Sequence, residues 1–181
     1  VGPPASGKSC FVIRASQQQY LEDTATTTTA AFLQKEYTHK NRDVKLEIWD
    51  TAGQEKFKSV SYSCFRKADM ALFFFDCSDI ESFKATDYWV QQVKEKVPDC
   101  IYLYLIGNKI DLNSQVSDQE ANDYATQNQL KYLKISAKTN QGIDQLFNAI
   151  GDDYLAKQLL GQQTKQKFEV KDITNQMKKC C

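Results

Sequence analysis

Short apolar runs alternate with longer amphipathic segments along most of this chain. Two of the runs, MALFFFD and IYLYLIG, are continuous, which is typical of strands buried on both faces of a parallel sheet. A shorter run, KYLKIS, predicts a weaker strand. Around the polar turn KNRD, the alternation of Val44, Leu46 and Ile48 along one face predicts two more strands, AFLQKEYTH and VKLEIWD.

Helix-start signals precede the amphipathic segments. Ser78 with Glu81, and Ser117 with Glu120, form capping-box patterns. One helix is expected to continue from Lys8 through FVIRASQQQY, and GIDQLFNAIGDDYL carries apolar residues at helical spacing. Strands that alternate with helices predict an α/β fold with a mostly parallel sheet. From about residue 160 the chain becomes rich in Gln and Lys, which predicts a mobile tail.

The amino-acid composition excludes only a few classes of protein. The chain has 181 residues with 23 Lys and Arg against 23 Asp and Glu, so its net charge gives no reason to expect nucleic acid as a partner. Four of the six cysteines are scattered singly, which favours reduced, buried thiols over a disulfide framework. His39 lies in a polar turn and is expected to be solvated rather than to bind a metal.

The segment GPPASGKS near the start fits the phosphate-loop pattern through Gly2, Gly7, Lys8 and Ser9. Such a loop wraps a diphosphate with backbone N–H groups, while the lysine neutralises phosphate oxygens and the serine binds Mg²⁺. The two prolines have no N–H to donate. The donors needed most come later and are retained, from Ala5, Ser6, Gly7, Lys8, Ser9 and Cys10.

A second motif, WDTAGQE, ends a predicted strand. Asp50 is placed to reach the metal through water, and the N–H of Gly53 to meet a terminal phosphate. Gln54 is placed to orient a water molecule. Taken alone, the same letters fit a plain strand followed by a turn equally well.

Two further motifs, GNKID and SAK, each follow a predicted strand. The Asp111 carboxylate can accept hydrogen bonds from the N1–H and the N2 amine of guanine, a pair that adenine lacks. Asn108 is expected to tie neighbouring loops together, and the stems of Lys109 and Lys138 to cover the faces of the base. In the SAK segment, Ser136 to Lys138, the N–H of Ala137 is placed to meet guanine O6. Ligands of open α/β sheets bind at the carboxyl ends of strands, where all four motifs lie.

With these motifs in place, the chain resembles the small GTPases of the Ras superfamily, and the Rab branch in particular. KLEIWDTAGQEKF, DCSDIESF, GNKIDL and ISAKT carry the resemblance, and AAFL is similar to the early-endosomal Rab group. The resemblance implies a P-loop NTPase three-layer sandwich with a mostly parallel sheet. It implies a GTPase domain over residues 1–158 and a flexible tail over residues 159–181 that ends in a prenylation motif.

The resemblance also assigns residues. It implies GTP or GDP and Mg²⁺ as cofactors, with Ser9 and Thr27 as direct metal ligands and Asp50 acting through water. Thr26 and Thr28 are the alternatives to Thr27. Tyr20 is expected beside the guanine, and Gln54 to orient the attacking water. Slow intrinsic hydrolysis is implied, in line with the phosphoryl-transfer template that is partly drawn from this superfamily.

The implied partners are those of a membrane switch. They comprise an exchange factor, a GTPase-activating protein, a GDP-dissociation inhibitor, the prenylation machinery and effectors that read Phe32, Trp49 and Cys64. Cys180 and Cys181 are expected to carry two lipid chains, which together suffice for stable anchoring. The protein is then a monomer that cycles between cytosol and the cytoplasmic face of intracellular membranes, with endosomes favoured.

Four departures from the family pattern shape the expectations. Thr29 stands where the family has Gly, and Cys64 where it has Tyr. Pro4 is expected to crowd Gln54 and an incoming arginine, and so to impair partner-stimulated hydrolysis. The alternative function is therefore a GTP-loaded membrane adaptor that hydrolyses poorly; a P-loop kinase or ATPase is disfavoured by NKID and SAK.

The fourth departure is the short lead-in to the phosphate loop. Only Val1 and Gly2 are available for the strand that feeds this loop, which is central in the sheet of this fold. We therefore expect the first strand to be truncated and its neighbours to be left unpaired.

Overall fold

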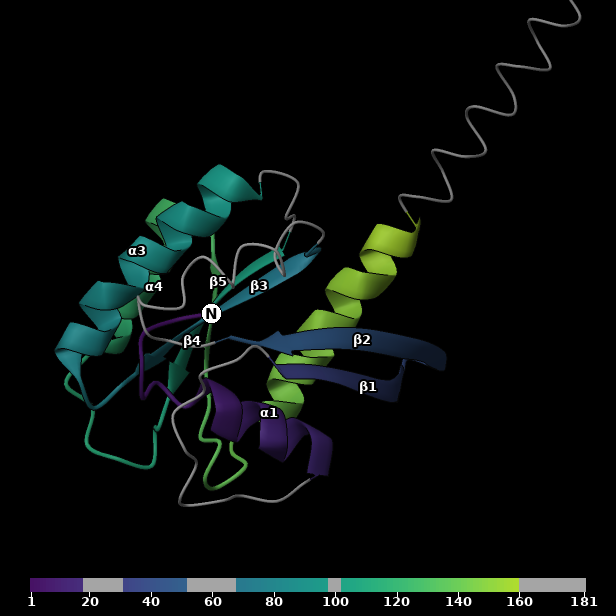
Figure 1. Ribbon diagram of the computed structural model, residues 1–181, viewed down its shortest axis with the longest axis horizontal. Helices are drawn as coiled ribbons and strands as arrows, with labels where there is room; N and C mark the ends of the chain where they lie inside the picture. The colour runs from purple at the N-terminus through teal and green to yellow at the C-terminus, as the bar shows by residue number, and fades with distance from the viewer. Residues whose placement is uncertain (18–30, 52–67, 98–101, 160–181) are drawn as a thin grey trace, which may run out of the picture.

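The computed structural model describes residues 1–17, 31–51, 68–97 and 102–159 (Figure 1). The strands are β1 (Ala31–His39), β2 (Arg42–Asp50), β3 (Met70–Asp76), β4 (Tyr102–Asn108) and β5 (Lys131–Lys134). The helices are α1 (Lys8–Gln17), α3 (Ile80–Lys96), α4 (Asp118–Asn128) and a C-terminal helix over residues 143–159. Every strand that the hydrophobic pattern predicts is present, because the apolar runs are bounded by polar turns.

The strands form two sheets. β1 and β2 are an antiparallel hairpin whose two-residue turn, Lys40 and Asn41, has φ angles of 49° and 58°. Positive φ at both turn positions suits the right-handed twist of the strands. β3, β4 and β5 lie side by side in that order and are parallel, which confirms the expected parallel sheet.

The parallel sheet is covered on both faces (Figure 1). Phe73 and Phe75 of β3 point into one core, which α3 and α4 close with Trp89, Val90 and Ala121 among others. Between them, Phe74 points the opposite way and packs with residues of α1 and the C-terminal helix, including Phe11 and Leu146. Alternate residues of a strand face opposite sides, so a continuous apolar run serves both cores. The three-layer α/β architecture is confirmed.

A cavity of about 1210 Å³ separates the hairpin from the parallel sheet, lined by residues of β2, β3, α1 and the C-terminal helix. Within the described ranges β2 and β3 share no ladder of hydrogen bonds. Val1 pairs with β3: its amino group donates to the Leu72 carbonyl at 2.9 Å, and its carbonyl accepts from the Phe74 N–H at 2.9 Å.

Helix α3 begins one residue later than its sequence signal indicates. The N-cap is Asp79, whose carboxylate accepts from the Glu81 N–H at 2.9 Å, so the expected capping box from Ser78 is wrong. The Ser78 hydroxyl instead donates to Asp76 at 2.6 Å. At α4 the expected box is present in both directions between Ser117 and Glu120.

His39 is buried, at 8% exposure, and not in a solvated loop as expected. Its Nε2 lies 2.7 Å from Asp152 Oδ1 on the C-terminal helix, so tertiary packing overrides the polar local sequence.

Cys77 is a buried free thiol. Its burial and the charge of Asp76 raise its pKa to about 12. Cys10 is half-buried. Among the helices of the described ranges, none has the length and apolar character needed to cross a membrane.

Candidate functional site

The phosphate loop runs from Gly2 into the first turn of α1, which begins at Lys8. Lys8 is 8% exposed and folds back over the loop. Its Nζ donates to the carbonyls of Pro3 and Gly2 at 2.8 and 3.1 Å, and to Ser6 Oγ at 3.4 Å. Burial lowers the pKa of Lys8 to about 8, although the nearby Asp50 opposes this shift. The loop thus surrounds the Lys8 ammonium group, a positive charge that a phosphate-binding site needs.

The loop approaches a second loop at Gly7. Gly7 has φ +83°, and a Cβ there would lie 2.2 Å from Asn108 Nδ2. A side chain at this position therefore meets both backbone strain and a clash. Ala5 also has a positive φ, of 58°, without being glycine. Glycine at position 7 allows the phosphate loop to pack directly against the end of β4.

Asn108 joins the two halves of the site. It ends β4, is 1% exposed, and donates from Nδ2 to the Ser6 carbonyl at 2.9 Å. Its Oδ1 accepts from the Ala137 N–H at 3.1 Å. One buried amide therefore contacts both the phosphate loop and the loop after β5, although Ser6 and Ala137 are far apart in sequence.

The loop after β5 also orients the acidic residue expected to read the base. Ser136 Oγ donates to Asp111 Oδ1 at 2.5 Å and accepts from the Thr139 N–H at 3.0 Å. Ser136 is fully buried, whereas Asp111 is exposed. Asp111 is thus fixed through one oxygen and presents its exposed side chain at the carboxyl end of the sheet, where a planar donor such as a base can approach.

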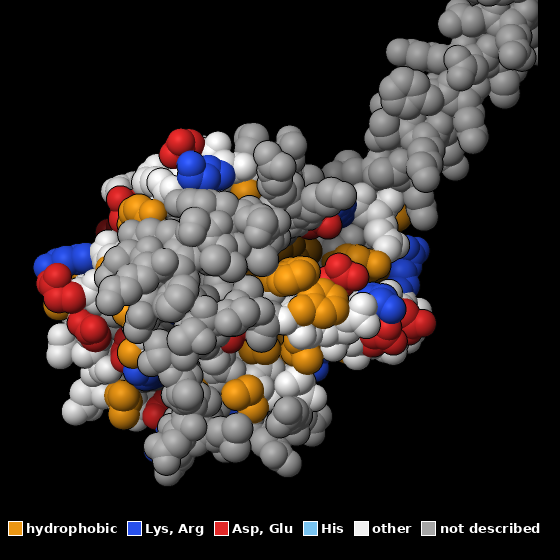
Figure 2. Space-filling model, in the orientation of Figure 1, with side chains coloured by type: hydrophobic (Ala, Val, Ile, Leu, Met, Phe, Trp, Pro, Cys, Tyr) orange, Lys and Arg blue, Asp and Glu red, His pale blue; other side chains and the backbone are white. Residues whose placement is uncertain are grey.

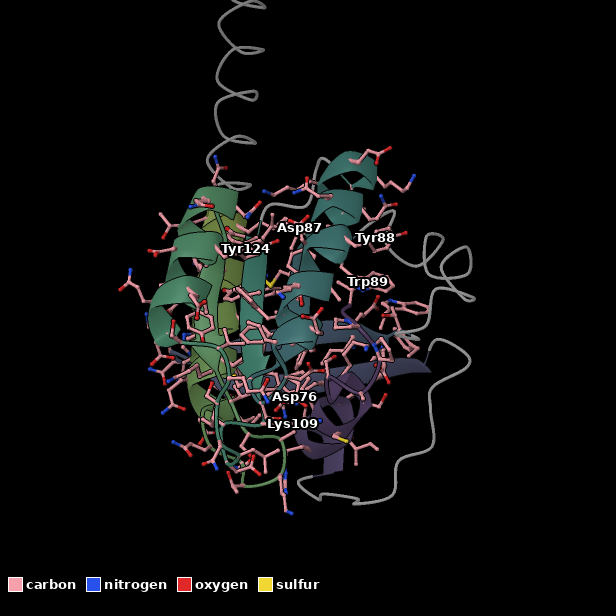
Figure 3. All side chains as sticks on the ribbon, turned by 90° about the vertical axis from the view of Figure 1, so that its left-hand side faces the viewer. Asp76, Asp87, Tyr88, Trp89, Lys109 and Tyr124 are labelled. Atoms are coloured by element: carbon pink, nitrogen blue, oxygen red, sulfur yellow. The ribbon has the colours of Figure 1, made fainter. Side chains whose placement is uncertain are left out.

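Asp76, which no motif singled out, lies at the same edge and points to Lys109 (Figure 3). Its Oδ2 is 2.6 Å from Lys109 Nζ, and its Oδ1 accepts from Ser78 N–H and Oγ at 2.9 and 2.6 Å. Burial would raise the pKa of Asp76, but the hydrogen bonds from Lys109 and Ser78 prevail and lower it. The signal available in the sequence was its place directly after an apolar run, the same place that Asn108 occupies.

Arg14, in the second turn of α1, is a second residue that the motifs missed. Its guanidinium donates from Nε to the Ala137 carbonyl at 2.9 Å and from Nη2 to the Lys138 carbonyl at 2.7 Å. No pattern in the sequence signals this contact, because the partners are backbone atoms of a loop more than a hundred residues away.

Two buried oxygens lie at the end of β2, where the sequence motifs predict the metal ion. Asp50, 6% exposed at the end of β2, has no hydrogen-bond partner for Oδ1 among the described residues, and the same holds for Thr51 Oγ1. Such orphaned atoms are costly unless a ligand satisfies them. Carboxylate and hydroxyl oxygens suit Mg²⁺, so the donor set of Ser9 and Asp50 fits this ion.

Two exposed aromatic side chains lie together on the hairpin. Phe32 and Trp49 are directly opposite in the β1–β2 ladder, with ring centroids 4.9 Å apart. They are 47% and 45% exposed, unusually high for such large apolar groups. Figure 2 shows hydrophobic side chains on the face in view near the hairpin. Several residues named from the sequence lie outside the described ranges: Tyr20, Thr27, Gly53, Gln54, Cys64, Cys180 and Cys181.

A phosphate loop that opens a helix, joined at the carboxyl edge of a parallel sheet to loops able to read a base, defines the class of P-loop nucleotide-binding proteins. The family model described as the Ras family matches residues 1–156. This chain therefore belongs to the Ras family.

Its relatives are Rab and Ypt proteins. It is 36% identical to GTP-binding protein ypt5 of Schizosaccharomyces pombe over 83% of this chain and 73% of the relative. It is 36% identical to Ras-related protein Rab-21 of Mus musculus over 81% of this chain and 67% of the relative. The similarity to Ras-related protein RabC of Dictyostelium discoideum, at 30% identity, covers 100% of this chain and 94% of the relative.

Proposed function

We propose that this chain is a Rab-like switch that binds GTP and GDP, hydrolyses GTP and regulates vesicle traffic from intracellular membranes. The observation that supports this most directly is the buried Asn108 amide, which holds the phosphate loop against the loop of Ala137. The relatives are named as a GTP-binding protein and a Rab protein, which supports the same function.

The phosphate end of the site neutralises the negative charge of the phosphates and orients the attacking water. Lys8, already inside the loop, turns its ammonium toward the phosphate oxygens, and the loop N–H groups from Ala5 to Cys10 point at the diphosphate. Ser9 and Thr27 would hold Mg²⁺ directly and Asp50 through water, and the ion would supply positive charge beside the phosphates. Gly53 donates to the terminal phosphate, and Gln54 orients the attacking water.

The base end of the site selects guanine. Asp111, fixed by Ser136, accepts from the N1–H and N2 amine of the base. The N–H of Ala137, which donates to Asn108 Oδ1 at 3.1 Å in this structure, is shared with O6 when guanine binds, and the stems of Lys109 and Lys138 lie over the base faces. Tyr20 packs at its edge. Adenine offers an amine at position 6 and no donor at N1, so ATP meets mismatched groups on two sides.

Effectors recognise the GTP-bound state at a surface of the protein, and lipid chains attach the protein to a membrane. Phe32 and Trp49, with Cys64, form the surface that effectors bind when GTP orders the segments around it. Cys180 and Cys181 carry two lipid chains that anchor the protein on the cytoplasmic face of membranes, endosomes in particular. An exchange factor, an activating protein and a GDP-dissociation inhibitor control the cycle.

Substituting Asp111→Asn tests the choice of base. The Asn amide offers a donor where guanine also donates, so GDP affinity is expected to fall by roughly 100-fold or more. Xanthine has a carbonyl at position 2, so affinity for xanthosine diphosphate is expected to rise. Asp118→Asn, a change of the same type at an exposed carboxylate of α4, is the control. Binding of ATP as tight as that of GTP by the unaltered protein would contradict the proposal.

Pro4 bears on the rate of hydrolysis. Its ring is exposed at the tip of the phosphate loop, where an activating protein must insert an arginine beside Gln54. We expect Pro4→Gly to raise activator-stimulated, single-turnover GTP hydrolysis by roughly tenfold, the usual scale of a modest change in transition-state fit. Intrinsic hydrolysis, measured without activator, serves as the reference. Equal stimulated rates in both proteins would remove Pro4 as an obstacle.

A further inference from the structure

The Lys8 ammonium has three N–H donors, and the chain itself supplies an acceptor for each of them. Two acceptors are the carbonyls of Pro3 and Gly2, at 2.8 and 3.1 Å from Nζ. The third is the hydroxyl oxygen of Ser6, at 3.4 Å. A phosphate oxygen that bonds to Lys8 as a further strong acceptor therefore replaces one of these three groups.

The Ser6 hydroxyl is the acceptor that phosphate replaces most easily. Its distance of 3.4 Å from Lys8 Nζ exceeds the range of about 2.7–3.2 Å that is usual for an N–H···O hydrogen bond. A phosphate oxygen carries negative charge, so it attracts the ammonium more strongly than a neutral hydroxyl does. The two carbonyl contacts are shorter, and we expect them to persist when phosphate binds.

Ser6 is fixed in place beside Lys8. It is fully buried, and its carbonyl accepts from Asn108 Nδ2 at 2.9 Å. Its hydroxyl donates to the Pro3 carbonyl at 2.9 Å, which directs the hydroxyl proton away from the ammonium. The lone pairs of Ser6 Oγ are therefore available to Lys8, and the hydroxyl is a ready acceptor whenever phosphate leaves.

We propose that the Ser6 hydroxyl competes with phosphate for the Lys8 ammonium and so accelerates the release of GDP. The inference rests on the proposed function, since it concerns the same nucleotide site. Removing the hydroxyl takes an acceptor of Lys8 from the nucleotide-free protein, whereas phosphate supplies that acceptor in the complex. The hydrogen bond from Ser6 to Pro3 is lost from both forms, so its loss largely cancels in the affinity.

Substituting Ser6→Ala in the full chain tests the competition. We expect GDP affinity to rise about threefold to tenfold, and release of fluorescently labelled GDP to slow by the same factor, the scale of one weak hydrogen bond. The Tm of protein stripped of nucleotide is expected to fall, because hydrogen bonds within the loop are lost. A purely structural role for Ser6 would instead lower both the Tm and the affinity.

A second pair of variants isolates the hydroxyl from the shape of the side chain. Ser6→Thr keeps a hydroxyl, whereas Ser6→Val has the same branched shape without one. We expect the Val variant to release GDP at least about threefold more slowly than the Thr variant. Release is measured from GDP-loaded protein, so the comparison holds even for a variant that unfolds once nucleotide is removed.

Thr86→Val is the matched control. The buried Thr86 hydroxyl also donates to a backbone carbonyl at 2.9 Å, that of Ser82. It lies on α3, across the parallel sheet from α1 (Figure 1). This variant should lower Tm and leave the rate of GDP release unchanged.

The outcomes separate the competition from the proposed function. Release from Ser6→Ala that is unchanged or faster, or equal rates for the Thr and Val variants, would overturn the role of Ser6 while leaving the proposed function intact. An unaltered protein that binds no GDP would instead overturn the proposed function itself.

Discussion

At the residue scale, Asp76 is a buried carboxylate that holds Lys109, one of the two lysines proposed to cover the base. It is 8% exposed and contacts Lys109 Nζ at 2.6 Å, while Ser78 donates two hydrogen bonds to its other oxygen. Lys109 itself has a left-handed backbone, with φ 64°. A lysine in an unfavourable backbone conformation keeps its direction only if its head group is held, and Asp76 holds it.

Substituting Asp76→Asn should therefore weaken both the fold and the base site. The amide keeps an acceptor for Ser78 but turns a neutral group toward the Lys109 ammonium. We expect the free energy of unfolding at pH 7 to fall by about 1–3 kcal/mol, the scale of a lost charge-assisted hydrogen bond. GDP dissociation should be several-fold faster than in the unaltered protein. Urea denaturation and a nucleotide-release assay provide the two measurements.

The effect of Asp76→Asn should also depend on pH in one direction. The pKa of Asp76 is lowered in the folded protein, so the folded state favours the charged carboxylate. Its stabilising contribution is complete above the ordinary value of 3.8 and is lost as pH falls through the lower, folded pKa. The difference between the two proteins in unfolding free energy should be constant from about pH 5 to 8. A difference that grows on acidification would contradict this assignment.

At the element scale, the β1–β2 hairpin is held against the C-terminal helix by its turn. His39 packs on Gly151, and Asp152 Oδ1 lies 2.7 Å from His39 Nε2 and 2.6 Å from Lys40 Nζ. Further along β1, the Tyr37 hydroxyl donates to the Phe147 carbonyl at 2.8 Å. Since β2 and β3 share no ladder in the described ranges, these contacts carry much of the attachment of the hairpin.

The glycine at this contact gives a prediction whose sign depends on its neighbour. Alanine in place of glycine inside a helix normally stabilises by up to about 1 kcal/mol. At Gly151, however, a Cβ would lie 2.6 Å from His39 Cγ, so Gly151→Ala should destabilise by about 1–3 kcal/mol. With His39→Ala already present, the same change should become stabilising. Chemical denaturation of the four proteins of this cycle measures the coupling.

Elements were predictable where the signal is local. Strands β3 and β4 follow directly from apolar runs, and β1 and β2 follow from the alternation around a polar turn. The Ser117–Glu120 box marks α4 because both partners are within one turn. The errors arose where another partner competes with the one that the local pattern indicates. Ser78 does not cap α3 because Asp76 accepts its hydroxyl, and His39 is buried because the C-terminal helix covers it.

At the scale of the whole molecule, three loops far apart in sequence meet at one edge of the sheet. The motifs predicted which residues would gather there, because parallel strands place their carboxyl ends together. Asp76 and Arg14 were missed for different reasons. Asp76 had the right position but no motif, whereas Arg14 acts on backbone atoms and leaves no pattern. The boundary at residue 158 and the roles of residues outside the described ranges remain predictions.

The bridge made by Asn108 should couple the stability of the whole molecule to nucleotide binding. Asn108→Ala leaves the Ser6 carbonyl and the Ala137 N–H without this partner inside a buried contact. We expect a loss of about 2–4 kcal/mol in unfolding free energy without nucleotide, from two buried groups that lose their hydrogen bonds. A ligand that binds only the folded state stabilises it in proportion to the logarithm of its concentration over Kd, so the GDP-induced rise in Tm should also shrink.

The control for Asn108→Ala is Asn122→Ala, which removes an amide whose Nδ2 donates to the Asp118 carbonyl within exposed α4. This variant should keep the full GDP-induced rise in Tm. Thermal unfolding of both variants over a range of GDP concentrations makes the comparison. If Asn108→Ala lowered Tm but kept the same GDP-induced rise as Asn122→Ala, Asn108 would support the fold alone, and the two loops would reach the nucleotide independently.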